Sequence, residues 1–295
     1  MLSILIPVYN YKIKNLLISL DNAFEIIDFD YEILCWEDGS VLYSQENKAI
    51  CKSIENANHL ISVENKGRIT SRKSLAQKAK YDWLLFLDAD VIPESKDFIE
   101  RYFEIIKKNN YEAIYGGICY DSETPESEYI LRWKYGRKYE QIEAKKRNKH
   151  PYKHIVSSNF LIKKNIFLKI CSQINNDGYG YDLFFGALMK SHKSNIYHID
   201  NSAIHKGLDK NAEFLKKTEI ATQRLYELYN HEHIRNTENS LLKLFEKIKE
   251  LHLRKIIATT FFIFKKPLTK QLLSTKPNIK LLQFYKLGYL SSLTF

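Results

Sequence analysis

Cysteine and glycine are scarce in this sequence, and their scarcity excludes several kinds of site. The four cysteines, Cys35, Cys51, Cys119 and Cys171, form no Cys-x-x-Cys pair. Their spacing predicts neither a zinc site nor a disulfide framework, and it fits a reducing compartment. The 10 glycines include no Gly-x-Gly-x-x-Gly and no P-loop, which argues against a dinucleotide site and a P-loop nucleotide site.

Long apolar runs are also missing. The longest, residues 256–264, has nine residues and includes Thr259 and Thr260, whereas a membrane-spanning helix needs about 20 apolar residues. The first six residues carry no basic side chain and Pro7 follows them, so we expect no secretory signal. We therefore expect a cytoplasmic protein, either soluble or peripheral on the inner face of the cell membrane.

The sequence does contain enough apolar residues for a large core and an excess of positive charge. Hydrophobic residues make up 44% of the 295 positions, which allows one large domain or one domain with an appendage. The net charge of +10 suits nucleotide diphosphates, nucleic acid or an anionic membrane surface. Nucleic acid is disfavoured because no basic recognition helix or RNA-binding aromatic pair is evident.

Strand-like and helix-like segments alternate up to residue 87. Apolar runs typical of buried strands and helical spacings of apolar residues occur in turn at 2–8, 15–27, 31–36, 44–56, 59–63, 66–79 and 83–87. This β-α-β-α-β-α-β order predicts an α/β protein with a mostly parallel sheet and right-handed crossovers.

Acidic residues follow two of these predicted strands. Glu37 and Asp38 come after the second strand, and Asp88 and Asp90 come after the five apolar residues of the fourth. Open α/β sheets bind ligands at the carboxyl ends of their strands. Two carboxylates two residues apart can present oxygens to one divalent cation, which could neutralise a diphosphate. The alternative is a solvated, Asp-rich turn.

Four segments resemble, in this order, motifs of the family 2 glycosyltransferases of the GT-A fold. They are SILIPVYN at 3–10, EDGS at 37–40, NKGRITSRK at 65–73 and LDAD at 87–90. The resemblance covers residues 1–210, and the second half of this range is similar to galactosyltransferase-type members. It implies a Rossmann-like GT-A catalytic domain at 1–210, a nucleotide-diphospho-sugar transferase sheet flanked by helices. A helical C-terminal extension would then occupy residues 211–295.

The resemblance implies a nucleotide-sugar site built from these segments. Asp38 would accept a hydrogen bond from the base or ribose, and Asp88 would reach the ribose or a metal-bound water. Arg72 could donate to carboxylates or phosphate, although Arg72 and Tyr9 could equally be salt-bridge and packing residues. The residues implied for donor binding are Pro7, Val8, Tyr9, Asp38, Arg72, Asp88 and Ala89.

The resemblance also implies a metal site. Asp90, in the Asp-x-Asp motif, would be the direct ligand, and a cation there would stabilise the departing diphosphate. His205 lies where galactosyltransferase-type sequences place a metal-binding histidine, and its imidazole favours Mn²⁺ over Mg²⁺. The alternative for His205 is a surface or capping residue.

Asp182 matches the general base of this family, and a base opposite the leaving group would invert the anomeric configuration. It could also be an ordinary first-turn helix residue. On the acceptor side the resemblance implies Asn159, in SSNFLI, and Tyr181, which replaces the usual Glu. Trp133, in the aromatic and basic segment 126–149, could stack on a sugar or belong to a packed aromatic stripe.

The resemblance therefore implies a metal-dependent, inverting glycosyltransferase. It would move a hexose or N-acetylhexosamine from a UDP-sugar to a hydroxyl of a glycan or lipid-linked glycan, in surface polysaccharide or lipid-linked oligosaccharide synthesis. Two alternatives stay open: a nucleotide-sugar-binding protein without turnover, which Tyr181 supports, and a metal-dependent nucleotidyltransferase. A haloacid-dehalogenase-type phosphatase is disfavoured because its Asp-x-Asp motif normally opens the chain.

The C-terminal residues differ in character from the rest. Residues 212–229 and 239–253 have the spacing of amphipathic helices, and aromatic residues then alternate with lysines. Such a segment could lie on an anionic membrane. It could instead form a helical cap or a contact between protein copies.

Overall fold

The computed structural model describes residues 1–24, 29–108, 111–174, 182–230 and 239–293. The chain divides into two compact units. We call the first the sheet unit, formed by Met1–Tyr120, Gln141–Gly178 and Leu188–Gly207. We call the second the helical unit, formed by Asp121–Glu140, Tyr179–Ala187 and Leu208–Phe295.

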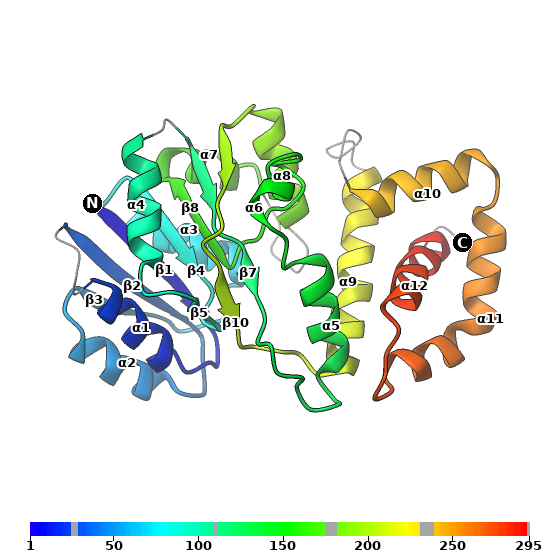
Figure 1. Ribbon diagram of the computed structural model, residues 1–295, viewed down its shortest axis with the longest axis horizontal. Helices are drawn as coiled ribbons and strands as arrows, with labels where there is room; N and C mark the ends of the chain where they lie inside the picture. The colour runs from blue at the N-terminus through cyan, green and yellow to red at the C-terminus, as the bar shows by residue number, and fades with distance from the viewer. Residues whose placement is uncertain (25–28, 109–110, 175–181, 231–238, 294–295) are drawn as a thin grey trace. The chain divides into compact units, whose positions relative to one another are not determined.

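The sheet unit contains a mostly parallel sheet, as the sequence predicted. Its described strands follow the order β3-β2-β1-β4-β8-β6-β9 (Figure 1). β3, β2, β1 and β4 pair in parallel, β8 is antiparallel to both of its neighbours, and β9 is parallel to β6. The bounds are β1 Leu2–Val8, β2 Tyr31–Asp38, β3 Ala57–Ser62, β4 Trp83–Leu87, β6 Ala113–Tyr115, β8 Asn159–Lys163 and β9 Ile196–His198.

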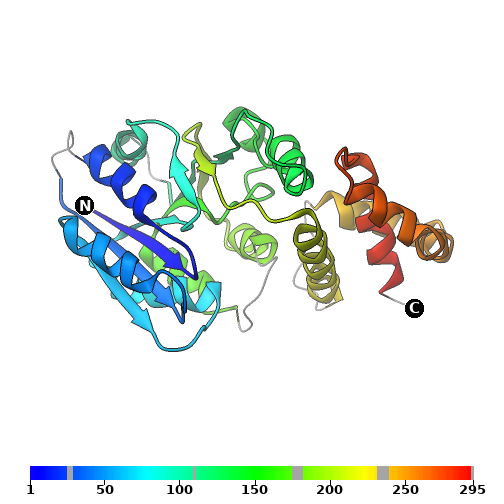
Figure 2. The ribbon, with the colours of Figure 1, turned by 90° about the horizontal axis from the view of Figure 1, so that it is seen from below.

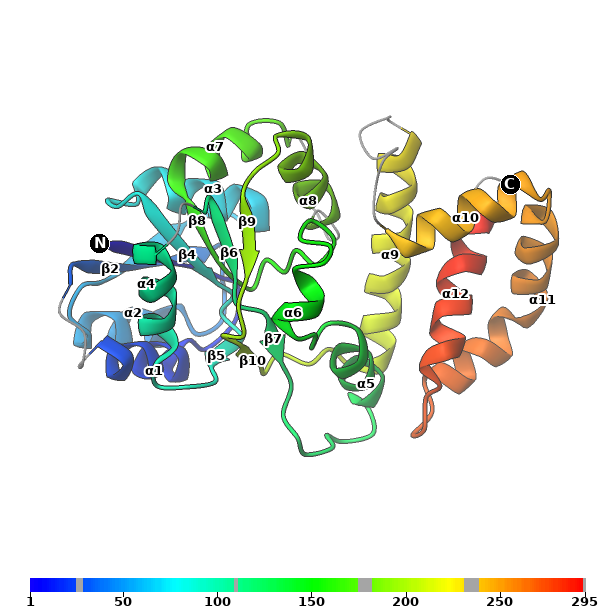
Figure 3. The ribbon, with the colours of Figure 1, turned by 45° about the horizontal axis from the view of Figure 1, so that its top comes forward.

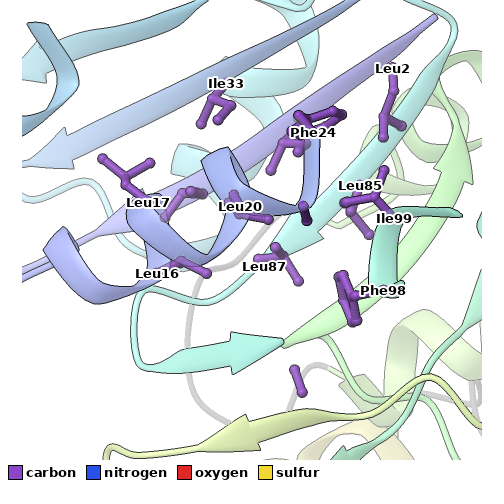
Figure 4. Close-up of a cluster of buried hydrophobic side chains, with 14 of the residues drawn as sticks. Leu2, Leu16, Leu17, Leu20, Phe24, Ile33, Leu85, Leu87, Phe98 and Ile99 are labelled. Atoms are coloured by element: carbon purple, nitrogen blue, oxygen red, sulfur yellow. The ribbon is translucent and has the colours of Figure 1, made fainter. Parts of the chain in front are cut away.

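Alternate residues of the inner strands face opposite layers of helices. Leu2 and Leu85 pack with Leu20 of α1 and Ile99 of α4 in one cluster (Figure 4). On the other face, the ring of Phe86 packs at a tilt against Phe167 of α7, with 4.4 Å between the ring centroids. Figure 2 shows β1 with α1 against it. The bounds are α1 Lys14–Phe24, α2 Ser44–Ser53, α3 Arg68–Lys78, α4 Phe98–Lys108, α6 Ala144–Arg147 and α7 Lys164–Cys171.

A second, small sheet lies in the same unit and has the order β5-β10-β7. Its strands are β5 Val91–Pro93, β7 Ile118–Cys119 and β10 Ala203–His205. β10 pairs antiparallel with β5, so His205 lies opposite Val91. This pairing brings residue 205 next to the end of the Asp-x-Asp segment.

A buried arginine ties α6 to the chain that follows β6 and β9 of the larger sheet. Arg147 is almost fully buried and its Nη1 lies 3.0 Å from the Nδ1 of His198, whose Nε2 lies 2.8 Å from the Pro151 carbonyl. Burial lowers the pKa of His198 from 6.5 to about 4. The Arg147 guanidinium also donates to the carbonyls of Tyr115, Gly116, Ile142 and Ile199.

The helical unit has its own apolar core. α11 and α12 run side by side in opposite directions (Figures 1 and 3), and Phe261 meets Tyr285 edge-on at 5.0 Å. The core residues are Leu131, Phe214, Leu215, Phe261, Leu268, Leu272, Ile279, Leu282 and Tyr285. The helices are α5 Ile130–Tyr139, α9 Asn211–Asn230, α10 Ser240–Glu250, α11 Arg254–Leu272 and α12 Ile279–Ser292, and α8 Asp182–Ser191 begins in this unit.

The amphipathic helices predicted at 212–229 and 239–253 are confirmed as α9 and α10. Among the described residues, no helix combines the length and the apolar character that crossing a bilayer requires.

Gly288 of α12 provides a test of the packing in the helical unit. A Cβ at this position would lie 2.5 Å from the Phe261 Cβ. We expect Gly288→Ala to lower the free energy of unfolding by about 1–2 kcal/mol, although helix propensity alone would raise it by roughly 1 kcal/mol. Urea unfolding followed by circular dichroism measures the sign. A midpoint equal to or above that of the wild type would contradict the close contact.

The buried His198 predicts a pH dependence of stability. Because its folded pKa is depressed, the unfolded chain takes up a proton first, and stability falls as the pH drops below 6.5. The expected loss between pH 7 and pH 5 is about 2 kcal/mol. His198→Gln should remove most of this loss, whereas the same change at the exposed His150 should not. Urea midpoints at the two pH values measure both, and equal slopes in the wild type and His198→Gln would refute the assignment.

Candidate active site

Asp38 organises the loop that precedes α3. Its side chain is buried at the end of β2, and its carboxylate accepts hydrogen bonds from the backbone N–H of Lys66 at 3.0 Å and of Gly67 at 2.9 Å. Gly67 has a φ of 88°, which favours glycine. The family resemblance implied a hydrogen bond from the base or ribose to Asp38. Its observed bonds instead go to the backbone, and a contact with a nucleotide stays a prediction.

Glu37 is a supporting residue that the sequence analysis missed. It is fully buried, and its Oε2 lies 3.1 Å from both Asn47 Nδ2 and His59 Nε2. Asn47 also donates to the Tyr11 carbonyl and accepts from the Ile13 N–H. The loop after β1 is therefore tied to β2 and β3. The available signal was an acid at the end of the apolar run of β2.

The residues after β1 form the second loop of the site. Asn10, with a φ of 49°, accepts hydrogen bonds from the N–H groups of Val41 and Leu42. Tyr9 is 55% exposed, so its ring is available to a ligand, whereas Val8 is buried and packs in the core. Pro7 is half-buried. Of these three residues implied for donor binding, Tyr9 has the most exposed side chain.

Asp88 and Arg72 form a largely buried ion pair. Arg72 Nη2 lies 2.5 Å from Asp88 Oδ1 and 3.2 Å from the Ser157 carbonyl. Burial raises the pKa of Asp88, but the charges of Arg72 and Arg68 outweigh burial, so its pKa lies below the ordinary value. Asp88 therefore stays ionised and anchors Arg72. The salt bridge given as an alternative for Arg72 is therefore present, and contacts of Arg72 and Asp88 with the donor stay predictions.

Asp90 and His205 meet through the pairing of β5 with β10. His205 Nε2 lies 3.6 Å from Asp90 Oδ2, and the Lys206 N–H donates to the Asp90 carbonyl at 2.8 Å. Asp90 Oδ1 is buried and has no hydrogen-bond partner in the described part of the chain. Burial is the main cause that raises the pKa of Asp90, and the charge of Asp88 adds to it. A cation bound at Oδ1 would offset both the burial of the Asp90 carboxylate and its repulsion from Asp88.

Asp90 and His205 are too few to hold a metal ion alone, and they suit a cation that the substrate also binds. Within the described residues no group of three or more His, Cys, Asp or Glu side chains converges on one point. Mg²⁺ is commonly bound by one or two carboxylates together with substrate phosphates and waters, and an imidazole is also acceptable to Mn²⁺. One carboxylate and one imidazole therefore fit a metal that is completed by a diphosphate.

Tyr11 and Arg68 lie close to the two aspartates and were not singled out by the sequence analysis. Burial raises the pKa of Tyr11, and the negative charge of Asp90 raises it further. Arg68, the first residue of α3, lowers the pKa of both Asp88 and Asp90. A guanidinium beside two carboxylates can also meet a phosphate. The signal for Arg68 was its place in the Lys-Gly-Arg segment.

Asn159 lies in the interior of the sheet unit. Its side chain is fully buried, accepts from the Tyr102 hydroxyl at 2.6 Å and donates to the carbonyls of Gly117 and Asn201 at 2.8 Å each. These bonds fix the turn after β6. Because none of its surface is exposed, the structure provides no support for the predicted acceptor contact of this side chain.

Two further predicted residues, Asp182 and Trp133, belong to the helical unit. Asp182 is the first residue of α8 and is half-buried. Trp133 is half-buried, donates from Nε1 to the Asp121 carbonyl at 2.9 Å, and has the Arg137 guanidinium 4.8 Å from its ring. Tyr181 lies outside the described residues. The sheet unit thus brings Arg72 of α3 to Asp88 and His205 of β10 to Asp90, and Asp38 at the end of β2 holds the loop that leads into α3.

Comparisons with solved structures agree on the fold. S. aureus TarS 1-349 in complex with UDP-GlcNAc is 15% identical, with a TM-score of 0.54 over 88% of this chain and 72% of that chain. Glucosyl-3-phosphoglycerate synthase from Mycobacterium tuberculosis, with Mg²⁺ and UDP, is 12% identical, with a TM-score of 0.54 over 80% of each chain. The mannosyltransferase PcManGT from Pyrobaculum calidifontis, with GDP-Man and Mn²⁺, is 11% identical, with a TM-score of 0.53 over 78% of this chain and 64% of that chain.

The chain spans 42% of the length of another TarS structure that it matches. No curated protein matches the sequence. The family model described as glycosyl transferase family 2 matches residues 3–171, and the GT-A fold predicted from the motifs is confirmed. Because this match covers more than half of the chain, the protein belongs to glycosyl transferase family 2 and is a glycosyltransferase.

Proposed function

We propose that this glycosyltransferase binds a nucleotide-diphosphate sugar and a divalent cation at the loops after β1, β2 and β4. The observation that carries the proposal is the buried Oδ1 of Asp90, which has no hydrogen-bond partner in the described structure and lies next to His205. The pKa of Asp90 is raised, and a bound cation would stabilise its ionised form. Asp90 and His205 would hold that cation.

The bound cation would neutralise charge that develops on the departing diphosphate. The protein residues have separate tasks around it. Arg68 adds a positive charge at the start of α3, and the Asp88–Arg72 ion pair keeps the Asp-x-Asp loop in place. Asp38 keeps the loop before α3 in position through the backbone of Lys66 and Gly67. The diphosphate would therefore meet a preformed surface.

We propose UDP as the nucleotide and a hexose or N-acetylhexosamine as the sugar. Two of the three structural neighbours are described with UDP or a UDP-sugar and one with GDP-Man. Tyr9 offers an exposed aromatic ring for the base, and Pro7 and Ala89 flank the same loops. Mn²⁺ is the preferred cation because an imidazole would be among its ligands.

We propose Asp182 as the general base for a glycan or lipid-linked glycan hydroxyl. It is the first residue of α8, where the helix dipole favours a negative charge. With Asp182 accepting its proton, the acceptor hydroxyl would attack the sugar from the side opposite the leaving group, and this attack would invert the anomeric configuration. Trp133, whose ring is half-exposed, would stack on the acceptor. Tyr181, which replaces the family's glutamate, would alter the acceptor contacts rather than the base.

Asp90→Asn tests the metal site. We expect UDP release from UDP-sugars with Mn²⁺ to fall by about 100-fold or more, because the variant loses the anionic ligand beside His205. Chelation of divalent cations should reduce the wild type to the same level. Asp97→Asn removes an exposed carboxylate paired with Arg101 and is the control. Full activity of Asp90→Asn, or an equal loss in the control, would overturn the assignment.

Asp182→Asn tests the base. We expect transfer to fall by about 10²–10⁴-fold, while UDP binding measured by calorimetry stays unchanged. Glu213→Gln removes another first-turn acid, in α9, and controls for the helix-dipole contribution. Equal product formation by Asp182→Asn and the wild type would contradict the assigned role. If the wild type binds UDP-sugar but releases no UDP with any acceptor, the protein is a binding module without turnover.

A further inference from the structure

The positive charge of the protein is concentrated near its C-terminal end. No Asp or Glu follows Glu250, whereas eight Lys and Arg residues do. They account for most of the net charge of +10. Three of the eight are exposed on α11, at Lys255, Lys266 and Lys270.

The same helix exposes an unusual amount of apolar surface. Its inner face packs against the core of the helical unit through Ala258, Phe261, Leu268 and Leu272. Outside this inner face the helix carries large apolar side chains that are mostly exposed: Ile256 59%, Phe262 83%, Ile263 63% and Phe264 52%. Phe262 and Phe264 are the only exposed phenylalanines among the described residues.

The apolar and basic residues share one side of α11. Residues four and seven positions apart lie on the same face of a helix, so Lys255, Phe262 and Lys266 form one stripe. Ile256, Ile263 and Lys270 form the adjacent stripe. Figures 1 and 3 show that α12 covers only one side of α11 within the helical unit. The outer stripes therefore face away from the core that α11 helps to form.

We propose that the outer face of α11 binds the surface of an anionic lipid bilayer. Phe262, Ile263 and Ile256 would enter the region between headgroups and acyl chains, and the lysines would lie at the lipid phosphates. This is the arrangement of an interfacial helix, which lies in the membrane plane and does not span it. Electrostatic attraction to anionic headgroups adds to the apolar burial.

The charge pattern favours a membrane over a second copy of the chain as the occupant. Two copies meeting through this face would bring lysines against lysines, since α11 contains no acidic residue. An anionic bilayer supplies the opposite charge and an apolar layer together. This inference does not rest on the proposed donor, metal or base, because vesicle binding is measured without any of them.

Vesicle flotation with the full chain tests the inference. We expect the wild type to float with vesicles containing phosphatidylglycerol and to remain below with phosphatidylcholine alone, and added salt should weaken binding. Lys255→Gln with Lys266→Gln should weaken the partition coefficient about 30-fold. Phe262→Ser with Ile263→Ser should weaken it about tenfold or more. Both pairs are exposed, so circular dichroism should stay unchanged.

The matched control lies on α10. Leu244→Ser with Lys247→Gln changes one exposed apolar and one exposed basic residue of the same unit and should leave binding as in the wild type. The inference is overturned if the wild type does not float with anionic vesicles, or if the control loses as much binding as the α11 variants. It is also overturned if sedimentation shows a dimer that Phe262→Ser with Ile263→Ser dissociates, because the face then binds a second copy.

Discussion

The antiparallel pairing of β5 with β10 is the constraint on which the site depends. It places His205 next to Asp90, although 114 residues separate them in the chain. A short strand after the Asp-x-Asp segment is enough to position His205, the candidate metal ligand, although it comes from the far end of the sheet unit. The larger sheet then supplies the rigid edge from which Asp38 and Asp88 extend. The site is thus assembled by two sheets with different tasks.

The acids at this edge are not equivalent, and their surroundings explain the difference. Asp38 binds backbone N–H groups, Asp88 binds an arginine, and Glu37 binds an asparagine and a histidine. Each of these carboxylates has a partner inside the protein, so it stabilises a loop. Glu37 and Asp90 each have one buried oxygen without a described hydrogen-bond partner. They differ at the other oxygen, because that of Glu37 lies 3.1 Å from both Asn47 and His59, whereas that of Asp90 lies 3.6 Å from His205. Asp90 is therefore the acid that is best suited to bind a cation from outside the protein.

The sequence predicted the features that depend on local pattern. The apolar run Trp83–Leu87 gave the central strand, and the acids after it lie at the strand edge. The local pattern could not predict which residues far apart in the sequence would contact each other. Asn159 looks like a site residue by motif but is buried by Tyr102 and the turn after β6. Glu37 looks like part of an exposed acidic turn, yet its hydrogen-bond partners come from α2 and β3.

Gly207 has a consequence for how the candidate metal site responds to a cation. A side chain here would overlap the Asp90 carboxylate, because the backbone of residue 207 lies close against that group. This close contact leaves the carboxylate little room to rotate, so its orientation is set before any ion binds. An ion therefore meets a ligand that has little rotational freedom left to lose, which lowers the entropic cost of coordination.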